Sequence, residues 1–299
     1  MNTNRTVSWR ELWDRTASKT GRAEARWICE EASGCFGEEF LDVVDDAASE
    51  RSVAHLDEML ARVQTGEPLQ YVLGHWSFRR LDLLVDNRVL IPRPETELIA
   101  EHAIALVRQL AAEGVARPLV VADLGTGSGA LGLSLASELP DGLVEVWLTD
   151  NSADAIDVAR ANTAGVGMAG ACVRFGLGSW FAALPAELRG QLALVVSNPP
   201  YIAPDDPQVA AVVRDWEPHS ALFAADDGLA DVRAVVVGAV EWLRPGGWIV
   251  VEIGSGQRAA VVELMTAAGL AHVEVHVDLA GLDRIAIGRK VSDGWRSQL

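Results

Sequence analysis

Apolar residues in the first quarter of the chain recur at helical spacing. From residue 8 to about residue 66 they return every three or four positions, as Trp9 and Trp13 do near the beginning. This period predicts amphipathic helices that pack as a small bundle. Trp9, Trp13 and Trp27 are expected in the core of that bundle. We assign residues 1–74 to this helical domain.

The pattern then becomes β-like. Trp76–Phe78 and Leu83–Val85 stand on either side of a polar break, which predicts a short hairpin. We assign residues 75–92 to a β-hairpin linker. Pro94 can occupy the first turn of the helix that follows, and Gly114 is expected to end that helix after about Glu113.

Beyond Pro118 short apolar runs alternate with helical patterns, and residues 93–299 are assigned to one α/β domain. Strands are predicted near 119–123, 143–149, 171–175, 192–197, 247–253, 272–278 and 283–288. Helices are predicted near 129–138, 152–164, 229–243 and 256–268. The last two strands are joined by residues 279–282, too few for a helical crossover, so the final strand should be antiparallel. A seven-stranded, mostly parallel sheet of this kind is typical of the Rossmann-like class I methyltransferases that use S-adenosylmethionine.

Composition narrows the possible partners. The chain has 299 residues and a formal net charge of -17. Residues 1–85 hold 15 acidic and 10 basic side chains (net -5), which leaves 27 and 15 (net -12) for the rest. Neither part carries the basic footprint of a duplex-binding protein. Charges near the start argue against a signal peptide, and no apolar run is long enough for a membrane span. We expect a cytoplasmic, monomeric protein.

Three cysteines, Cys29, Cys35 and Cys172, are widely spaced and have no clustered histidine partner. This spacing indicates neither a disulfide framework nor a metal site. Reduced, packed thiols are the expectation.

A glycine loop follows the strand predicted at 119–123. Alternating glycines let the backbone approach a ligand closely and present N–H groups from the next helix. The third glycine comes one residue earlier than in a dinucleotide-binding loop, and an acidic residue precedes it, which favours S-adenosylmethionine with its ammonium group. A structural turn is the alternative. The candidate cofactor-binding residues here are Asp123, Gly125, Thr126, Gly127, Ser128 and Gly129.

Two further residues are candidates for the same cofactor site. Asp150 ends the next strand, where a carboxylate can accept hydrogen bonds from both ribose hydroxyls; alternatively it caps the helix that opens at Ser152. Trp180 follows the third strand and could stack on adenine, although core packing is an alternative.

Asn198-Pro199-Pro200-Tyr201 follows the strand at 192–197 and carries the candidate acceptor chemistry. A planar amide or aromatic amino nitrogen is a poor nucleophile because its lone pair is delocalised. The Asn198 side-chain oxygen and the Pro199 carbonyl can accept its two N–H bonds and direct the lone pair toward a methyl group. The two prolines stiffen the loop, and Tyr201 offers a flat surface for the acceptor. Asn198, Pro199 and Tyr201 are therefore the candidate catalytic residues, and all four residues are candidates for substrate binding.

Several motifs, in this order after a helical domain, resemble those of the release-factor glutamine methyltransferases, the PrmC/HemK family. They are Ile91–Glu97, Asp123–Gly129, Ser197–Ile202, Glu217–Leu222 and Asp227–Leu229. The resemblance implies transfer from S-adenosylmethionine to the glutamine of the Gly-Gly-Gln loop of peptide chain release factors, giving N(5)-methylglutamine. It also implies that the glycine loop, Asp150, Trp180 and Asn198 bind the cofactor and that Asn198 to Tyr201 hold the glutamine. We expect the helical domain and the Pro92–Glu97 segment to dock the release factor away from this slot.

One position departs from the family pattern. An acidic residue usually stands before the aromatic that Trp180 matches, and here Ser179 takes that place, which should alter cofactor affinity. Three alternatives remain open. They are a glutamine methyltransferase for a ribosomal protein, an adenine-amino DNA methyltransferase, and a scaffold that binds the cofactor without chemistry. The missing basic surface argues against the DNA enzyme, and the intact Asn198 and Tyr201 argue against the scaffold.

Overall fold

The computed structural model describes residues 6–207 and 209–291. The chain separates into two compact units, one that ends at His75 and one that begins at Trp76. Each has its own hydrophobic core. Along the described residues no helix is long and apolar enough to cross a membrane.

The first unit is helical, as its apolar period predicts. Its helices are α1 (Trp9–Thr20), α2 (Arg22–Ser33), α3 (Glu38–Val43), α4 (Glu50–Gln64) and α5 (Leu69–Leu73). A capping box starts α1, because the Ser8 hydroxyl accepts the Glu11 N–H and the Glu11 carboxylate accepts the Ser8 N–H. Trp9 and Trp13 are buried and both meet the edge of Phe40.

Trp27 does not belong to this core. Its side chain is 41% exposed, so the prediction that it is buried is wrong. The inward face of α2 is formed by Ala25, Ile28, Cys29 and Ala32. Trp27 lies two residues after Ala25, roughly 200° around the helix, and therefore points away from that face.

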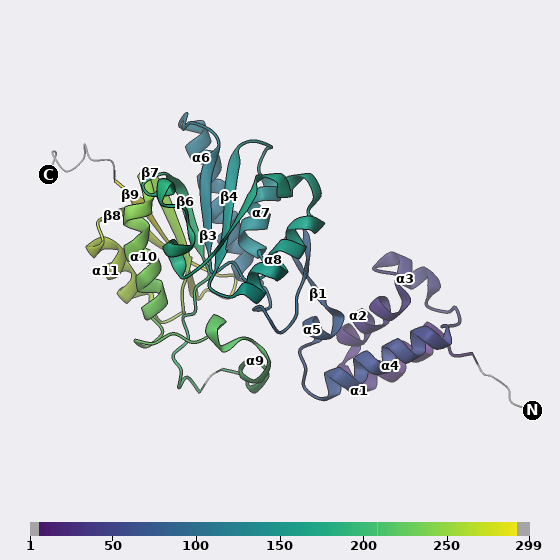
Figure 1. Cartoon of the computed structure of the whole chain (residues 1–299). Coiled ribbons are helices and arrows are strands. Elements are labelled where there is room, and N and C mark those ends of the chain that lie inside the picture. Colours follow the sequence, from purple (N-terminus) through teal and green to yellow (C-terminus); the bar gives the residue numbers. More distant parts are fainter. Residues whose placement is uncertain (1–5, 208, 292–299) are drawn as a thin grey trace, which may run out of the picture. The chain divides into compact units, whose positions relative to one another are not determined.

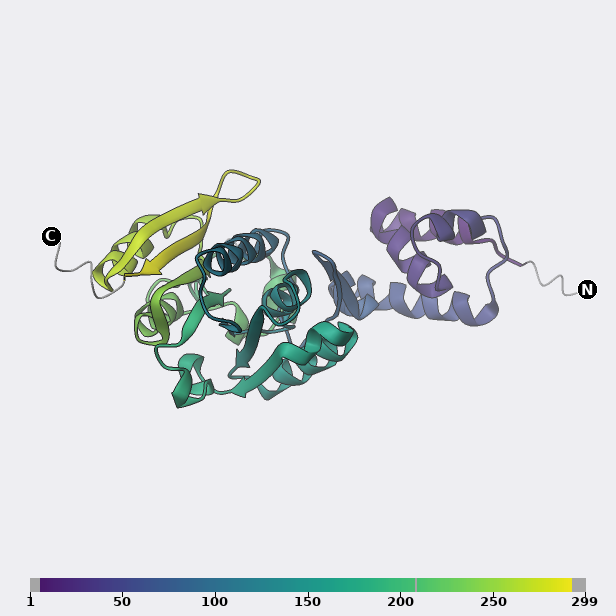
Figure 2. The same cartoon turned by 90° about the horizontal axis from the view of Figure 1, so that it is seen from above.

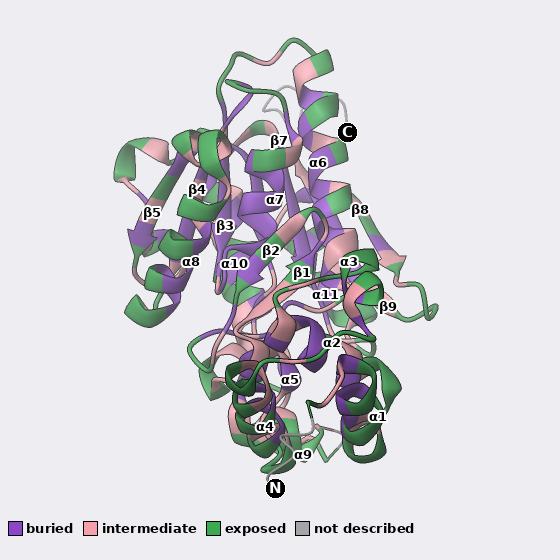
Figure 3. Cartoon of the chain, turned by 90° about the vertical axis from the view of Figure 1, so that its right-hand side faces the viewer, coloured by how far each residue is buried: buried purple, intermediate pink, exposed green. Residues whose placement is uncertain are grey.

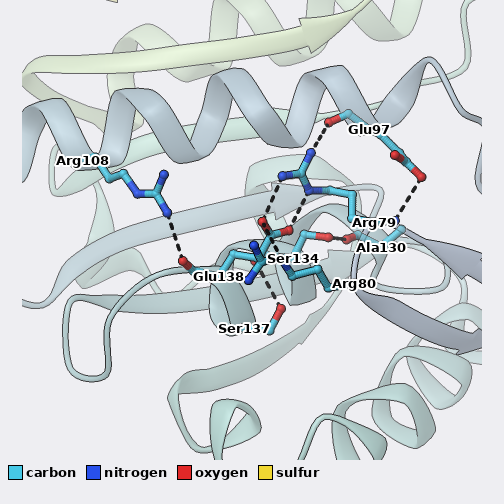
Figure 4. Close-up of polar contacts among 8 residues, drawn as sticks. All are labelled: Arg79, Arg80, Glu97, Arg108, Ala130, Ser134, Ser137 and Glu138. Atoms are coloured by element: carbon cyan, nitrogen blue, oxygen red, sulfur yellow. Dashed lines mark hydrogen bonds and ion pairs between the residues drawn. The ribbon is translucent and has the colours of Figure 1, made fainter.

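A two-stranded hairpin follows, with β1 (His75–Phe78) and β2 (Leu81–Leu84). Its turn is fixed to the second unit by Arg79, which has a φ of 53°. The Arg79 guanidinium makes a two-pronged ion pair with Glu138, at 2.6 and 2.9 Å, and also donates to the Glu97 carbonyl (Figure 4). The Arg79 backbone N–H donates to the Glu97 carboxylate at 3.0 Å. These contacts attach the hairpin turn to two helices, α6 (Thr96–Ala112) and α7 (Ala130–Glu138).

The second unit is built on a seven-stranded sheet in the order β5-β4-β3-β6-β7-β9-β8 (Figure 1). The strands are β3 (Leu119–Leu124), β4 (Val144–Asp150), β5 (Val173–Leu177), β6 (Leu192–Ser197), β7 (Leu243–Glu252), β8 (Leu270–Val277) and β9 (Asp283–Lys290). The remaining helices are α8 (Ala153–Gly165), α9 (Ala211–Trp216), α10 (Ala230–Trp242) and α11 (Arg258–Ala267). Short 3-10 turns lie at Gly167–Cys172, Trp180–Ala183, Ala186–Leu188 and His219–Ala221.

The predicted α/β architecture is confirmed. Strands β3 to β7 pair in parallel, and β9 runs antiparallel to both β7 and β8. Helices α10 and α11 pack on one side of the sheet, where Val232, Val236 and Met265 join its buried core. Helices α6 and α7 pack against one another, and Figure 2 gives the view along these layers. The central strands are buried along their length (Figure 3).

One strand begins earlier than predicted. β7 starts at Leu243, which pairs with Leu192, but regular pairing resumes only at Leu194 and Trp248. Pro245, Gly246 and Gly247 lie in the irregular stretch between them. A proline cannot donate to the ladder, so these residues conceal the strand in the sequence pattern.

The ion pair between Arg79 and Glu138, called here the Arg79 clamp, yields a stability prediction. Arg79→Met should lower the free energy of unfolding by about 3 kcal/mol, because it leaves the Glu138 carboxylate, 8% exposed, without its partner. Arg80→Met is the matched control, since the Arg80 side chain is 81% exposed and 4.0 Å from Glu138. Its loss should stay below about 1 kcal/mol. Equal losses by urea denaturation for the two variants would contradict the clamp.

Candidate functional site

A pocket of about 390 Å³ opens at the carboxyl ends of β3, β4 and β6. This is the edge at which open parallel sheets bind ligands, beside the point where the chain reverses its direction of winding. Most of the predicted cofactor residues line it. They are Asp123, Gly125, Thr126, Gly127, Ser128, Asp150, Trp180 and Asn198.

Asp123 shapes the glycine loop from below. Its side chain is 1% exposed, and its Oδ2 accepts hydrogen bonds from the Thr126 hydroxyl at 2.7 Å and the Gly132 N–H at 2.9 Å. Its Oδ1 is buried and accepts no hydrogen bond from any described residue. Burial raises the pKa of Asp123 to about 6, against the two hydrogen bonds, which lower it. The Oδ1 of Asp123, a residue that lines the pocket, therefore has no hydrogen-bond donor among the described residues.

The loop glycines have different tasks. Gly125 has a φ of 70°, and a Cβ there would lie 3.4 Å from the Trp180 ring. Gly129 is left-handed and begins α7, and it does not line the pocket. A Cβ on Gly129 would meet Leu133 at 2.9 Å, so its absent side chain serves helix packing.

Asp150 closes the loop from the neighbouring strand. Its Oδ2 accepts the Gly127 N–H at 3.0 Å, and its Oδ1 accepts the Ser152 N–H at 2.9 Å. Burial raises the pKa of Asp150 despite these backbone bonds. The cap of α8 is Ser152, which accepts the Ala155 N–H at 3.2 Å. The alternative role as helix cap therefore belongs to Ser152, and Asp150 remains in the pocket wall.

Trp180 takes part in both the pocket and the packing. It has a φ of 47°, an uncommon conformation for a bulky residue, and it packs at the edge of the core while it lines the pocket. Asp231 accepts a hydrogen bond from the Trp180 side chain and also lines the pocket. Burial raises the pKa of Asp231, against this hydrogen bond. Ser179, at the position where the resemblance suggests an acid, lines the same pocket.

A second pocket of about 320 Å³ adjoins the first. Leu90, Asn198 and Ala221 line both pockets. Tyr201 lines only the second and Pro200 only the first, whereas Pro199 is buried and lines neither. Asn198 therefore stands where two cavities meet.

The loop after β6 is held from several sides. The Ser197 hydroxyl donates to the Leu124 carbonyl at 2.6 Å, which ties the ends of β6 and β3 together. The Tyr201 carbonyl accepts from the Gln257 side chain at 3.1 Å. Residue 202 forms a parallel bridge with Phe223, which brings the later motif segment against the loop.

Another buried contact joins two of the sequence motifs. Glu217, 4% exposed, accepts the Ile91 N–H at 3.1 Å and forms an ion pair with Arg93. Arg93 lines the second pocket. The Ile91–Glu97 segment and the Glu217–Leu222 segment thus form adjoining walls.

Sequence reasoning missed three functional candidates. Thr96 and Asp231 line the first pocket, and Glu252 accepts a hydrogen bond from the hydroxyl of Tyr201, which lines the second. Glu252 could have been found, because it is an acidic residue at the carboxyl end of an apolar strand. Thr96 was visible only as part of its motif, and no signal marked Asp231.

Adjacent pockets at the carboxyl edge of such a sheet, one lined by the glycine loop and one by the Asn-Pro-Pro-Tyr loop, define a class I methyltransferase. Among the described residues no three His, Cys, Asp or Glu side chains gather as a metal site. A family model described as the methyltransferase small domain matches residues 102–215. A second, the PrmC N-terminal domain, matches residues 14–74.

Curated relatives give the narrower family. The chain is 41% identical over 276 residues to a release factor glutamine methyltransferase of Burkholderia pseudomallei, which covers 91% of this chain and 93% of the relative. It is 40% identical over 267 residues to that of Bordetella pertussis, with 89% and 94% covered. For Xylella fastidiosa the identity is 42% over 248 residues, with 83% and 84% covered. The chain belongs to the release factor glutamine methyltransferase family.

Gly228 offers a test of how the acceptor loop is packed. A Cβ there would lie 2.1 Å from the Tyr201 carbonyl oxygen, and its φ is 83°. Gly228→Ala should therefore displace the loop and lower stability by about 2 kcal/mol or more. Gly256→Ala is the control, since no atom lies within 4 Å of its Cβ position. Thermal unfolding that does not separate the two variants would refute this packing.

Proposed function

We propose that the protein methylates the side-chain amide of the glutamine in the Gly-Gly-Gln motif of peptide chain release factors, with S-adenosylmethionine as the methyl donor. The product is N(5)-methylglutamine. The observation that carries the proposal is the position of Asn198, which lines both pockets. Family membership supports the same activity, because the relatives are named as release factor glutamine methyltransferases.

The first pocket fits S-adenosylmethionine in its donor set. Asp123 supplies a buried carboxylate oxygen without a donor, which suits a ligand ammonium. Asp150 supplies a carboxylate for ribose hydroxyls, and Trp180 supplies an aromatic face for adenine, over a Gly125 that leaves space for it. Thr126, Gly127, Ser128 and the left-handed Gly129 complete the proposed cofactor loop. When bound, the cofactor supplies an electrophilic methyl group on sulfur.

The second pocket receives the glutamine amide in this proposal. The Asn198 Oδ1 and the backbone carbonyl of the buried Pro199 accept its two N–H bonds. Tyr201 bounds the slot, and Pro200 stands on the side of the first pocket. Two acceptors on one nitrogen weaken its conjugation with the carbonyl and leave its lone pair facing the first pocket. The nitrogen would form a bond to the methyl carbon as the carbon–sulfur bond of the donor breaks and a neutral thioether leaves. It would afterwards release one proton to solvent, so no strong base is required. Catalysis is then mainly positioning.

We further propose that residues 1–74 dock the release factor, with residues 75–92 as the linker. Contacts remote from the reacting amide supply binding energy that a short peptide cannot. In this scheme the Michaelis constant for a Gly-Gly-Gln peptide exceeds that for the whole factor. Equal efficiency on the two substrates would remove the docking role.

The experiment for the function itself uses methyl-labelled S-adenosylmethionine and four acceptors. These are a release factor, the same factor with its motif glutamine changed to alanine, a ribosomal protein mixture, and duplex DNA. Label should enter only the release factor that keeps its motif glutamine. Label in a ribosomal protein or in DNA would establish one of the alternative activities instead.

Asn198 provides the residue-level prediction. Asn198→Ala should reduce kcat about 100-fold or more, because it removes an acceptor aimed at the reacting nitrogen. Cofactor affinity, measured by calorimetry, should fall much less, since Asn198 is only one part of the first pocket. Asn151→Ala, an exposed residue at the rim of that pocket, is the comparison. Near wild-type turnover in Asn198→Ala would contradict the assignment of Asn198 as an acceptor for the reacting nitrogen.

A further inference from the structure

Glu252 is a buried carboxylate that has no role in the proposed mechanism. It ends β7, is 0% exposed and lines neither pocket. Its Oε2 accepts the Thr96 hydroxyl at 2.6 Å, and its Oε1 accepts the Tyr201 hydroxyl at 3.0 Å. One carboxylate therefore holds a residue from α6 and a residue from the acceptor loop. A group so costly to bury calls for a role.

The hydrogen bonds continue to Asn198. The Asn198 Nδ2 donates to the Thr96 Oγ1 at 3.3 Å. A hydroxyl has one proton, and an ionised carboxylate can only accept. Thr96 must therefore give its proton to Glu252, which leaves its oxygen able only to accept from Asn198. The amide NH₂ of Asn198 is the group turned toward Thr96, and the Oδ1 is turned away from it.

We propose that Glu252 is a positioning residue that, through Thr96 and Tyr201, sets the orientation of the Asn198 amide and of the Tyr201 ring in the acceptor slot. The inference rests on the proposed function, since it assigns Asn198 Oδ1 to the substrate nitrogen. The reversed amide would present two donors to a nitrogen that needs acceptors. Orientation of this one amide then decides whether the slot is productive.

The surroundings of Glu252 make the orientation of the Asn198 amide sensitive to pH. Burial, with a smaller contribution from the nearby Glu95, raises the pKa of Glu252 to about 7, against the bonds from Thr96 and Tyr201 and the charge of Arg284, which lower it. Burial and the Glu252 charge also raise the pKa of Tyr201, so that hydroxyl stays a donor. Above pH about 7 the Glu252 carboxylate is ionised and can only accept, so Asn198 donates to Thr96 and Thr96 donates to Glu252. Below pH about 7 a protonated Glu252 can donate to Thr96, which can then donate to Asn198 and turn its amide around. We therefore expect kcat to fall as the pH falls.

Glu252→Gln tests the proposal with little change in shape. The glutamine NH₂ can donate to Thr96, whose proton is then free to point at Asn198 and favour the reversed amide. We expect kcat to fall roughly 10- to 100-fold. The Michaelis constant for the release factor and the calorimetric affinity for S-adenosylmethionine should change less than about 3-fold, since no pocket wall is removed. The limb of the pH profile near 7 should disappear.

Two further variants address the intermediate residue. Thr96→Val removes the hydroxyl at nearly constant shape and should lower kcat about as far as Glu252→Gln does. Thr96→Ser, which keeps the hydroxyl, should recover most of that loss. Glu263→Gln, an exposed glutamate on α11, is the matched control and should leave both kcat and the pH profile unchanged.

The outcomes separate this inference from the proposed function. Wild-type kcat with a retained limb near pH 7 in Glu252→Gln would overturn the positioning role, while release factor methylation would stand. Equal losses of kcat and of cofactor affinity would make Glu252 a structural residue and also overturn it. If the wild-type protein labels a different acceptor, the proposed function fails, and the same variants measured on that acceptor still decide the role of Glu252.

Discussion

The hydrogen bonds of Asp123 are the constraint on which the cofactor pocket depends. A single buried oxygen accepts from the Thr126 hydroxyl inside the loop and from the Gly132 N–H in the first turn of α7. The loop and the start of the helix are thereby held against the end of β3. Gly132 permits this closeness, because a Cβ there would lie 2.1 Å from Leu148 and 3.1 Å from the Asp123 carboxylate. The glycine that matters most for this contact lies outside the glycine loop.

A second buried carboxylate mirrors this arrangement on the acceptor side. Asp123 is the penultimate residue of β3 and Glu252 is the last residue of β7, and these strands lie on either side of β6, which Asn198 follows. Both acids have a raised pKa, which means that their hydrogen bonds do not fully offset the cost of burying charge. Sites that hold fixed charges in this way exchange stability for preorganised geometry. Each acid fixes part of its pocket: Asp123 holds Thr126, and Glu252 holds Thr96 and Tyr201.

Local patterns predicted the second unit well because its strands are short apolar runs between clear turn signals. The helix at α6 and the strand at β6 lie close to their predicted bounds. Trp27 failed because a three-to-four period tolerates an aromatic on the wrong face. Asp150 was placed correctly at a strand end, yet only coordinates separate its role from that of Ser152. Thr96 and Glu252 are 156 positions apart, and no local pattern reports a hydrogen bond over that distance.

The insertion of β9 between β7 and β8 makes the acceptor side of the site depend on a strand that follows α11. Glu252, at the end of β7, pairs with Ile285 of β9, so β9 helps to enclose the carboxylate that holds Thr96 and Tyr201. The glycine loop is built on β3 and β4, which do not pair with β7 or β9. Damage to β9 would therefore loosen the acceptor side of the site and leave the supports of the glycine loop in place.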